Sequence, residues 1–136
     1  MRAIDVALIL TTAVIVVLVT GVMRVESFEG NANAVEILLF SAKWCGHCSA
    51  YAASGTFDRF SAATKYVTCK TLDADKHKDM VSKYGVEGYP WIVAVEASTG
   101  DKLLDFKGDR NDLGALAQFA QDASDLELSR HVISVK

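Results

Sequence analysis

The chain has 136 residues, a formal net charge of −3 at pH 7 and three cysteines. This length allows one ordinary domain with a short remainder. The near balance of positive and negative charge argues against nucleic acid as a partner. A disulfide framework needs paired cysteines, so an odd number of them argues against that class of small, cross-linked protein.

An uncharged, apolar run covers residues 6–23 (VALILTTAVIVVLVTGVM). As a helix, this run would extend about 27 Å, close to the roughly 30 Å hydrocarbon core of a bilayer. A cleaved signal peptide is one alternative, but its apolar region is about 7–15 residues long, and the A-x-A sequence at 32–34 lies well past the run. A buried core helix is another. We predict a transmembrane anchor at residues 1–23 and a polar linker at 24–34.

Residues 35–123 alternate between strand-like and helix-like patterns. Apolar, β-favouring runs predict strands at 35–40, 67–72, 92–95 and 102–107, and amphipathic patterns predict helices at 49–64, 75–84 and 111–123. In the first helix Gly55 is a weak point, whereas Asp75 and Gly85 are the expected caps of the second. The order β-α-β-α-β-β-α predicts an α/β fold with a central mixed sheet flanked by helices.

Residues 124–136 fall outside this set of elements. We expect them to form a C-terminal tail. Its apolar residues suit a short strand or a partner-binding segment, and a loosely ordered terminus is the alternative.

Two cysteines separated by two residues, Cys45 and Cys48, stand between the first strand and the first helix. The N-terminus of a helix offers unpaired N–H groups and the positive end of the helix dipole. Both stabilise a thiolate at the first cysteine. The second cysteine lies about one helical turn further on, close enough to attack a mixed disulfide. The spacing therefore predicts a thiol–disulfide exchange centre.

Zinc binding is the competing use of such a cysteine pair. A structural zinc site needs four ligands, and the remaining candidates, Cys69, His77 and His131, are scattered along the chain. We therefore expect no metal and no cofactor. Cys69 stands among apolar neighbours and is interpreted as a buried free cysteine.

Residues 44–48 (WCGHC), residues 84–90 (YGVEGYP) and the order of elements resemble a thioredoxin-fold domain of the protein disulfide isomerase type. The resemblance covers roughly residues 35–123. It implies that Cys45 attacks substrate disulfides and that Cys48 resolves the resulting mixed disulfide.

The resemblance also implies roles for residues around the dithiol. An imidazole at His47, next to Gly46 and between the cysteines, would stabilise the Cys45 thiolate and favour oxidation or isomerisation over reduction. Arg110 falls where the family has an arginine thought to lower the pKa of the resolving cysteine; a surface cation at a helix start is the alternative.

Four residues are implied to contact substrate. Pro90 is expected to be cis and to face the dithiol, so that the backbone before it pairs with an extended substrate segment. Trp44 is expected to pack beside the site, and Trp91 to add a large apolar face next to the substrate groove. Tyr89 precedes the proline in the same loop.

The chain departs from the family pattern at four positions, one of which is Trp91, in place of the small residue usual after the proline. Leu39 stands where the family usually has a buried acid that relays protons, and Thr71 where it has the lysine partner of that acid. We therefore expect slower proton transfer to and from Cys48 unless water carries the proton. Ala53 replaces a proline that kinks the first helix, so we expect that helix to run straighter.

Together these features predict a membrane-anchored thiol–disulfide oxidoreductase or isomerase that acts on protein substrates and is recharged by a separate redox partner. An oxidising compartment is implied, either the lumen of the endoplasmic reticulum or another extracytosolic space. The alternative is a membrane-anchored docking module on the same fold, such as a minor capsid-associated protein of a large DNA virus. That module would lie in a membrane or capsid assembly, at the interface between the virion membrane and the capsid.

Overall fold

The computed structural model describes residues 33–135. The predicted anchor at 1–23 and most of the predicted linker lie outside the described residues. Within the described part of the chain, no helix combines the length and the apolar character that crossing a bilayer requires. The membrane anchor therefore stays a prediction.

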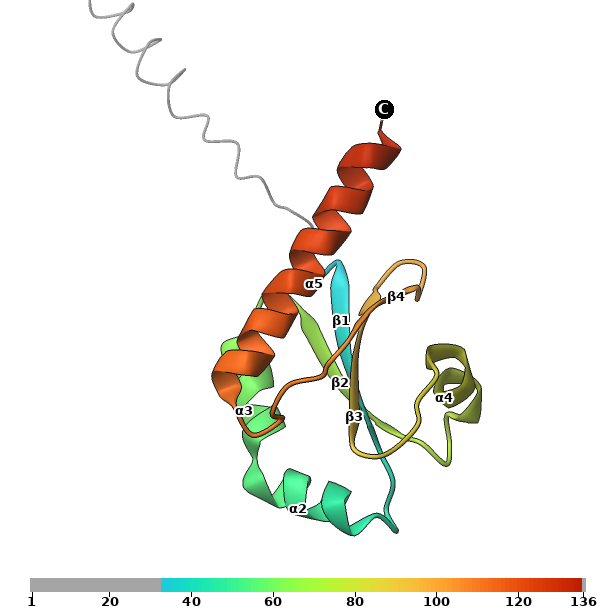
Figure 1. Cartoon of the computed structure of the whole chain (residues 1–136), viewed down its shortest axis with the longest axis vertical. Helices are drawn as coiled ribbons and strands as arrows, with labels where there is room; N and C mark the ends of the chain where they lie inside the picture. The colour runs from blue at the N-terminus through green and yellow to red at the C-terminus, as the bar shows by residue number, and fades with distance from the viewer. Residues whose placement is uncertain (1–32, 136) are drawn as a thin grey trace, which may run out of the picture. The chain divides into compact units, whose positions relative to one another are not determined.

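A mixed four-stranded sheet forms the centre of the fold (Figure 1). Its strands are β1 (Val35–Ser41), β2 (Thr68–Asp73), β3 (Trp91–Glu96) and β4 (Lys102–Asp105), in the spatial order β2-β1-β3-β4. The pair β1–β2 is parallel, whereas β1–β3 and β3–β4 are antiparallel. The predicted mixed sheet, with its antiparallel hairpin at one edge, is confirmed.

Residues 33–135 contain four helices: α2 (Gly46–Ser54), α3 (Thr56–Ala63), α4 (Lys78–Tyr84) and α5 (Leu113–Ser134). In Figure 1, α3 and α5 lie on one side of the sheet and α4 lies on the other. The helical region after the cysteines is broken between α2 and α3, so the prediction of one straighter helix is wrong. Gly55 has a φ of +64°, a left-handed conformation that ends α2 and that glycine adopts without steric cost.

The start of α4 also differs from the prediction. Asp75 does not cap this helix, which begins at Lys78 with His77 in the N-cap position. The Asp75 carboxylate instead accepts a hydrogen bond from the indole N–H of Trp44, at 3.1 Å. At the other end Gly85 has a φ of +64° and caps the helix, as predicted.

Helix α5 does not end near Ala123 but continues to Ser134, so most of the expected tail is helical. Asp112 caps its start, because its carboxylate accepts the backbone N–H of Gly114 at 2.8 Å. Beyond the buried face, hydrogen bonds between side chains one turn apart support the helix; one joins Gln121 to Asp125. Figure 1 shows the C-terminal half of α5 extending past the sheet.

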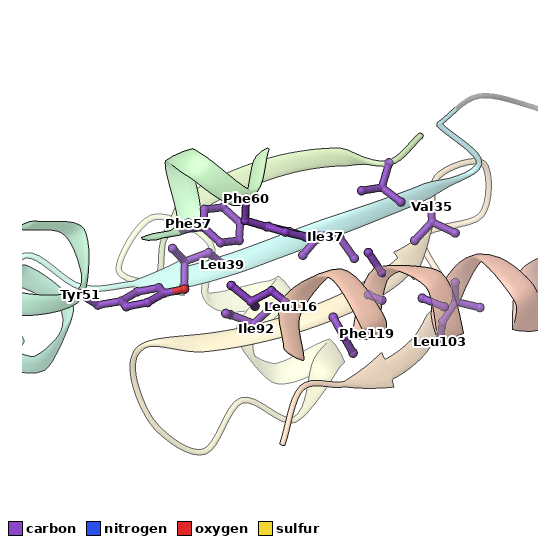
Figure 2. Packing of buried hydrophobic residues seen from close by; sticks show 14 residues of the cluster. Val35, Ile37, Leu39, Tyr51, Phe57, Phe60, Ile92, Leu103, Leu116 and Phe119 are labelled. Carbon is purple, nitrogen blue, oxygen red and sulfur yellow. The ribbon is translucent and has the colours of Figure 1, made fainter. Parts of the chain in front are cut away.

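Apolar residues on both faces of the sheet are buried, as a layered α/β fold requires. On the side of α3 and α5, Ile37 and Leu39 pack against Phe60 and Leu116 (Figure 2). The alternate β1 residues, among them Phe40, pack on the opposite face with α4. Strand β1 is thus buried on both faces, and it holds the loop that leads to Cys45 against a rigid support.

Candidate active site

Cys45 occupies the N-cap position of α2, with extended backbone angles (φ −89°, ψ 113°). Its sulfur accepts a hydrogen bond from the backbone N–H of Cys48 at 3.4 Å. An oxygen of Ser, Thr, Asp or Asn makes this bond at most helix starts. Here a sulfur takes that place, as the spacing of the two cysteines predicts.

The surroundings of Cys45 favour its thiolate. The main cause is the hydrogen bond from the Cys48 thiol, which lowers the pKa of Cys45 below its ordinary value. The backbone N–H groups of Cys48 and His47 and the positive charge of Arg110 lower this pKa further, against the effect of burial. Cys45 is buried at 9% exposure, against 3% for Cys48, so its sulfur is the more open of the two to a substrate.

Cys48 differs from Cys45 in both its exposure and the direction in which its pKa is changed. It is only 3% exposed. Burial raises the pKa of its thiol, and the hydrogen bond that it donates to Cys45 raises it further. Both cysteines are free thiols in this structure. A more deeply buried thiol with a raised pKa therefore lies beside a less buried thiol with a lowered pKa.

The loop before β3 faces the dithiol. The Tyr89–Pro90 peptide bond is cis, as the resemblance implied. The Cys45 thiol donates a hydrogen bond to the carbonyl oxygen of Tyr89, with 3.7 Å between sulfur and oxygen. The Tyr89 ring lies edge-on to Trp44, with 5.9 Å between ring centroids, and Trp44 is 70% exposed. The site is thus a nucleophilic sulfur, a carbonyl and an exposed aromatic ring on one surface.

The sequence of the chain matches the thioredoxin family over residues 20–122. The chain belongs to the thioredoxin family. Protein disulfide-isomerase like 2-2 of Arabidopsis thaliana is 35% identical over 91 residues, which are 66% of this chain and 19% of that protein. Protein disulfide-isomerase tigA of Aspergillus niger is 37% identical over 87 residues, 61% of this chain and 23% of that protein. The chain thus spans about a fifth of the length of these relatives.

Solved structures have the same fold. The first thioredoxin domain of mouse protein disulfide-isomerase A4 superposes with a TM-score of 0.56 and 25% identity, over 67% of this chain and 64% of that one. The zinc-bound form of human ERp44 gives the same TM-score at 22% identity, over 69% of this chain and 28% of that one. At this identity the second likeness concerns the fold alone.

In this thioredoxin domain, Arg110 lies next to the loop of the cis proline. It is exposed, yet its guanidinium donates a hydrogen bond to the carbonyl oxygen of Pro90 at 2.5 Å. The hydroxyl of Tyr51 donates to the carbonyl oxygen of Arg110 at 3.0 Å. The charge of Arg110 lowers the pKa of Cys45. An effect of Arg110 on Cys48 stays a prediction.

The other predicted residues take different places. His47 is exposed, and its backbone N–H, rather than its ring, acts on the pKa of Cys45; the role of the imidazole stays a prediction. Gly46 begins α2, and a Cβ added there would meet nothing within 4 Å. Trp91 begins β3 half-buried, and its indole N–H donates to Asp105 at 3.2 Å. Its contact with substrate also stays a prediction.

Cys69 is half-buried rather than fully buried, because it lies on β2 at the edge of the described sheet. Burial nevertheless raises the pKa of its thiol. Across residues 33–135, no three side chains of His, Cys, Asp or Glu gather closely enough to hold a metal ion.

Two residues of the site were not predicted from the sequence. Asp75 anchors the ring of Trp44, and its role is visible only once the chain has folded. Ser41, the last residue of β1, lies near Cys48 and lowers the pKa of that thiol through a side-chain hydrogen bond. The only signal for Ser41 was its position four residues before Cys45, at the end of a buried strand.

Proposed function

We propose that the protein is a thiol–disulfide oxidoreductase of the protein disulfide isomerase type, which exchanges disulfides with protein substrates through Cys45 and Cys48. The observation that carries this proposal is the N-cap position of Cys45, whose sulfur accepts the N–H of Cys48. A helix start that stabilises a thiolate makes an accessible cysteine nucleophilic near neutral pH. The names of the relatives support the same activity.

In the reducing direction, the Cys45 thiolate attacks one sulfur of a substrate disulfide. A mixed disulfide forms, and the other substrate sulfur leaves as a thiolate. Cys48 then loses its proton and attacks the sulfur of Cys45, which releases the second substrate thiolate. Two electrons have passed from the cysteine pair to the substrate. Oxidation of a substrate dithiol is the same sequence in reverse. In isomerisation another thiolate of the same substrate attacks the mixed disulfide, which forms a new substrate disulfide and releases Cys45 as a thiolate.

Substrate recognition follows from the surface around Cys45. We propose that an extended substrate segment pairs with the backbone before Pro90, in the manner of an added β-strand. The exposed ring of Trp44 would cover one side of that segment, and Trp91 the other. The carbonyl oxygen of Tyr89 already lies within hydrogen-bonding distance of the Cys45 thiol.

The membrane anchor and the compartment belong to the same proposal. The apolar run at residues 6–23 supports a single-pass anchor. A dithiol that oxidises or isomerises proteins acts in an oxidising compartment. We therefore propose that the domain lies in the lumen of the endoplasmic reticulum or in another extracytosolic space, where a separate redox partner recharges it.

Trapping tests the activity. The variant Cys48→Ala should accumulate mixed disulfides with protein substrates, because nothing resolves the bond at Cys45. The matched control is Cys45→Ala with Cys48→Ala, which keeps the fold but removes the attacking sulfur. Mixed disulfides in the single variant and none in the control support the proposal. An equal yield from both variants, or none from either, overturns it.

A second candidate is the docking module. The observation that favours it is a set of exposed apolar side chains near the end of α5: Leu128, Val132, Ile133 and Val135. Surface clusters of this kind mark interaction sites. As a docking module in a membrane or capsid assembly, the protein would keep its full biological activity without both cysteines, and Cys48→Ala would trap no partner.

A further inference from the structure

Two adjoining hollows surround the buried sulfur of Cys48. The inner hollow has a volume of about 70 Å³ and the outer, more open one about 300 Å³. Four residues line both of them: Ser41, Cys48, Ala52 and Thr71. The two hollows therefore adjoin at Cys48, and the outer one reaches it from the side of β2, where Thr71, Leu72 and Asp73 line it.

Much of the inner hollow is apolar. Leu39, Tyr51 and Phe57 line it from β1, α2 and α3, and Figure 2 shows these three side chains on one side of β1. Leu39 is 6% exposed and supplies no group that could accept a proton. Its partner in the register of β1 and β2 is Thr71, whose hydroxyl is also no base near neutral pH.

Cys48 nevertheless has to lose a proton in the proposed reaction. Only a thiolate attacks the mixed disulfide, and burial raises the pKa of the Cys48 thiol. The thiol is too deeply buried for bulk solvent to reach it directly, at 3% exposure. The hollows that Cys48 lines, with their polar groups, offer the proton a route to solvent.

Ser41 is the polar side chain best placed for this step. It ends β1, it is half-buried, and it lines both hollows together with Cys48. A hydrogen bond from its side chain lowers the pKa of the Cys48 thiol. A cavity with room for water binds it where polar partners are present, and the Ser41 and Thr71 hydroxyls are such partners.

We propose that water in these hollows, held by the Ser41 hydroxyl, takes the proton of Cys48 when that thiol resolves the mixed disulfide. The inference rests on the exchange activity proposed above. The Cys48 S–H bond breaks and its proton passes to water and on to bulk solvent. The sulfur then attacks Cys45, an S–S bond forms between the two cysteines, and the substrate leaves as a thiolate that takes a proton from water. Ser41 is a positioning residue, since it changes no bonds itself.

Several charged or titratable groups face this path, and they come from each element around it. The inner hollow is lined by Tyr51 of α2 and Asp58 of α3, the outer by Lys43 before α2 and Asp73 of β2, and Cys45 lies against Cys48 itself. Asp58 is exposed, so it marks an exit to solvent rather than a buried base. The pH dependence of resolution is therefore expected to follow Cys48.

The experiment uses the full-length chain with Cys69→Ala, so that only the pair reacts. The reduced protein is mixed with dithio-bis-nitrobenzoate in a stopped-flow instrument. Attack by Cys45 releases one coloured thiolate, and resolution by Cys48 releases a second. The variants are Ser41→Ala, which removes the hydroxyl, and Ser41→Thr, which keeps it. Ser129→Ala, on the exposed face of α5, is the matched control.

We expect Ser41→Ala to slow the second phase by about threefold or more and to move its pH midpoint upward. A rise of one pKa unit lowers the thiolate population of Cys48 about tenfold. The rate falls by less than this, because a more basic thiolate is more nucleophilic. The first phase should keep its rate, and Ser41→Thr should restore the second.

Three results would overturn the inference. They are an unchanged second phase in Ser41→Ala, an equal slowing of both phases, and a failure of Ser41→Thr to restore the rate. If the unsubstituted pair shows no second phase, the exchange activity itself fails, and this inference fails with it. That outcome is distinguishable because it appears before any change at Ser41.

Discussion

The backbone N–H of Cys48 donates a hydrogen bond to the sulfur of Cys45 at 3.4 Å, across the first turn of α2. After the hydrogen bond from the Cys48 thiol, which is the main cause, this bond also lowers the pKa of Cys45, and the two together give the cysteines different chemistry. The sulfur at the helix start is stabilised as an anion, whereas the sulfur one turn later is buried against Ala42 and keeps its proton. The hydrogen bond between the two sulfurs, the burial of Cys48 and the helix start together distinguish the nucleophile from the resolving group.

The first prediction concerns the pH dependence of Cys45. Alkylation of Cys45 by iodoacetamide should have a midpoint below that of an unperturbed cysteine, because the surroundings of Cys45 lower its pKa. In Cys48→Ala the main cause is lost, so the midpoint should rise. Both proteins carry Cys69→Ala. A midpoint that stays the same in Cys48→Ala would contradict the assigned cause.

The lowered pKa of Cys45 also makes the stability of the fold depend on pH, in a direction that follows from the lowering. Since the Cys45 pKa is lower in the folded state, the reduced protein gains stability as pH rises from the folded to the unfolded pKa. That contribution is lost as pH falls through the folded pKa. Urea unfolding of the reduced protein against Cys45→Ala, over this pH window, should therefore show a difference that grows with pH. A difference that shrinks would contradict the direction of the shift.

Arg110 tests whether the charge beside the loop of the cis proline acts on Cys45. Arg110→Gln should raise the Cys45 pKa and lower the rate of the first thiol-release phase near pH 7. The residue is exposed and solvent screens its charge, so we expect the rate to fall by about fivefold or less. Arg110→Lys keeps the charge and should retain most of the rate. Equal losses in both variants would assign the effect to the contact with Pro90 instead.

Gly55 should be intolerant of a side chain for conformational reasons alone. An added Cβ there meets nothing within 4 Å, but the φ of +64° disfavours any other residue. We expect Gly55→Ala to lower the free energy of unfolding by about 1–2 kcal/mol. The control is Gly88→Ala, where the space is also open and no positive φ occurs. Equal stability of the two variants would contradict this explanation.

Trp44 should contribute to substrate binding rather than to the chemical step. Trp44→Phe keeps an aromatic ring for the contact with Tyr89 but loses the bond to Asp75, and Trp44→Ala loses both. For a peptide disulfide substrate we expect KM to rise more in the alanine variant than in the phenylalanine variant, with kcat little changed. A fall in kcat at constant KM would instead place Trp44 in the exchange step.

Local patterns predicted most of the fold. The β1 run, the hairpin and the cap at Gly85 depend on residues close together in the chain, and short stretches report such features well. The end of α5 was missed because its second half has little buried surface. Hydrogen bonds one turn apart, such as the one from Gln121 to Asp125, hold it instead.

The candidate site was predicted only in part, because some of its contacts join residues that are far apart in the chain. The N-cap role of Cys45 follows from a strand and a helix that meet at a known spacing. The hydrogen bond between Trp44 and Asp75 does not follow from the sequence, because these residues come together only through the packing of the loops after β1 and β2. The place of Ser41 beside Cys48 likewise depends on how α2 lies against the end of β1.

The reduction potential of the Cys45–Cys48 pair tests the proposed activity most directly. It is measured by equilibrating the full-length chain, with Cys69→Ala, against glutathione buffers of graded ratio. We predict one reversible two-electron transition with a potential nearer to about −180 mV than to about −270 mV, as suits an oxidant or isomerase. Two sulfurs that titrate independently, without forming an internal disulfide at any ratio, would contradict the account.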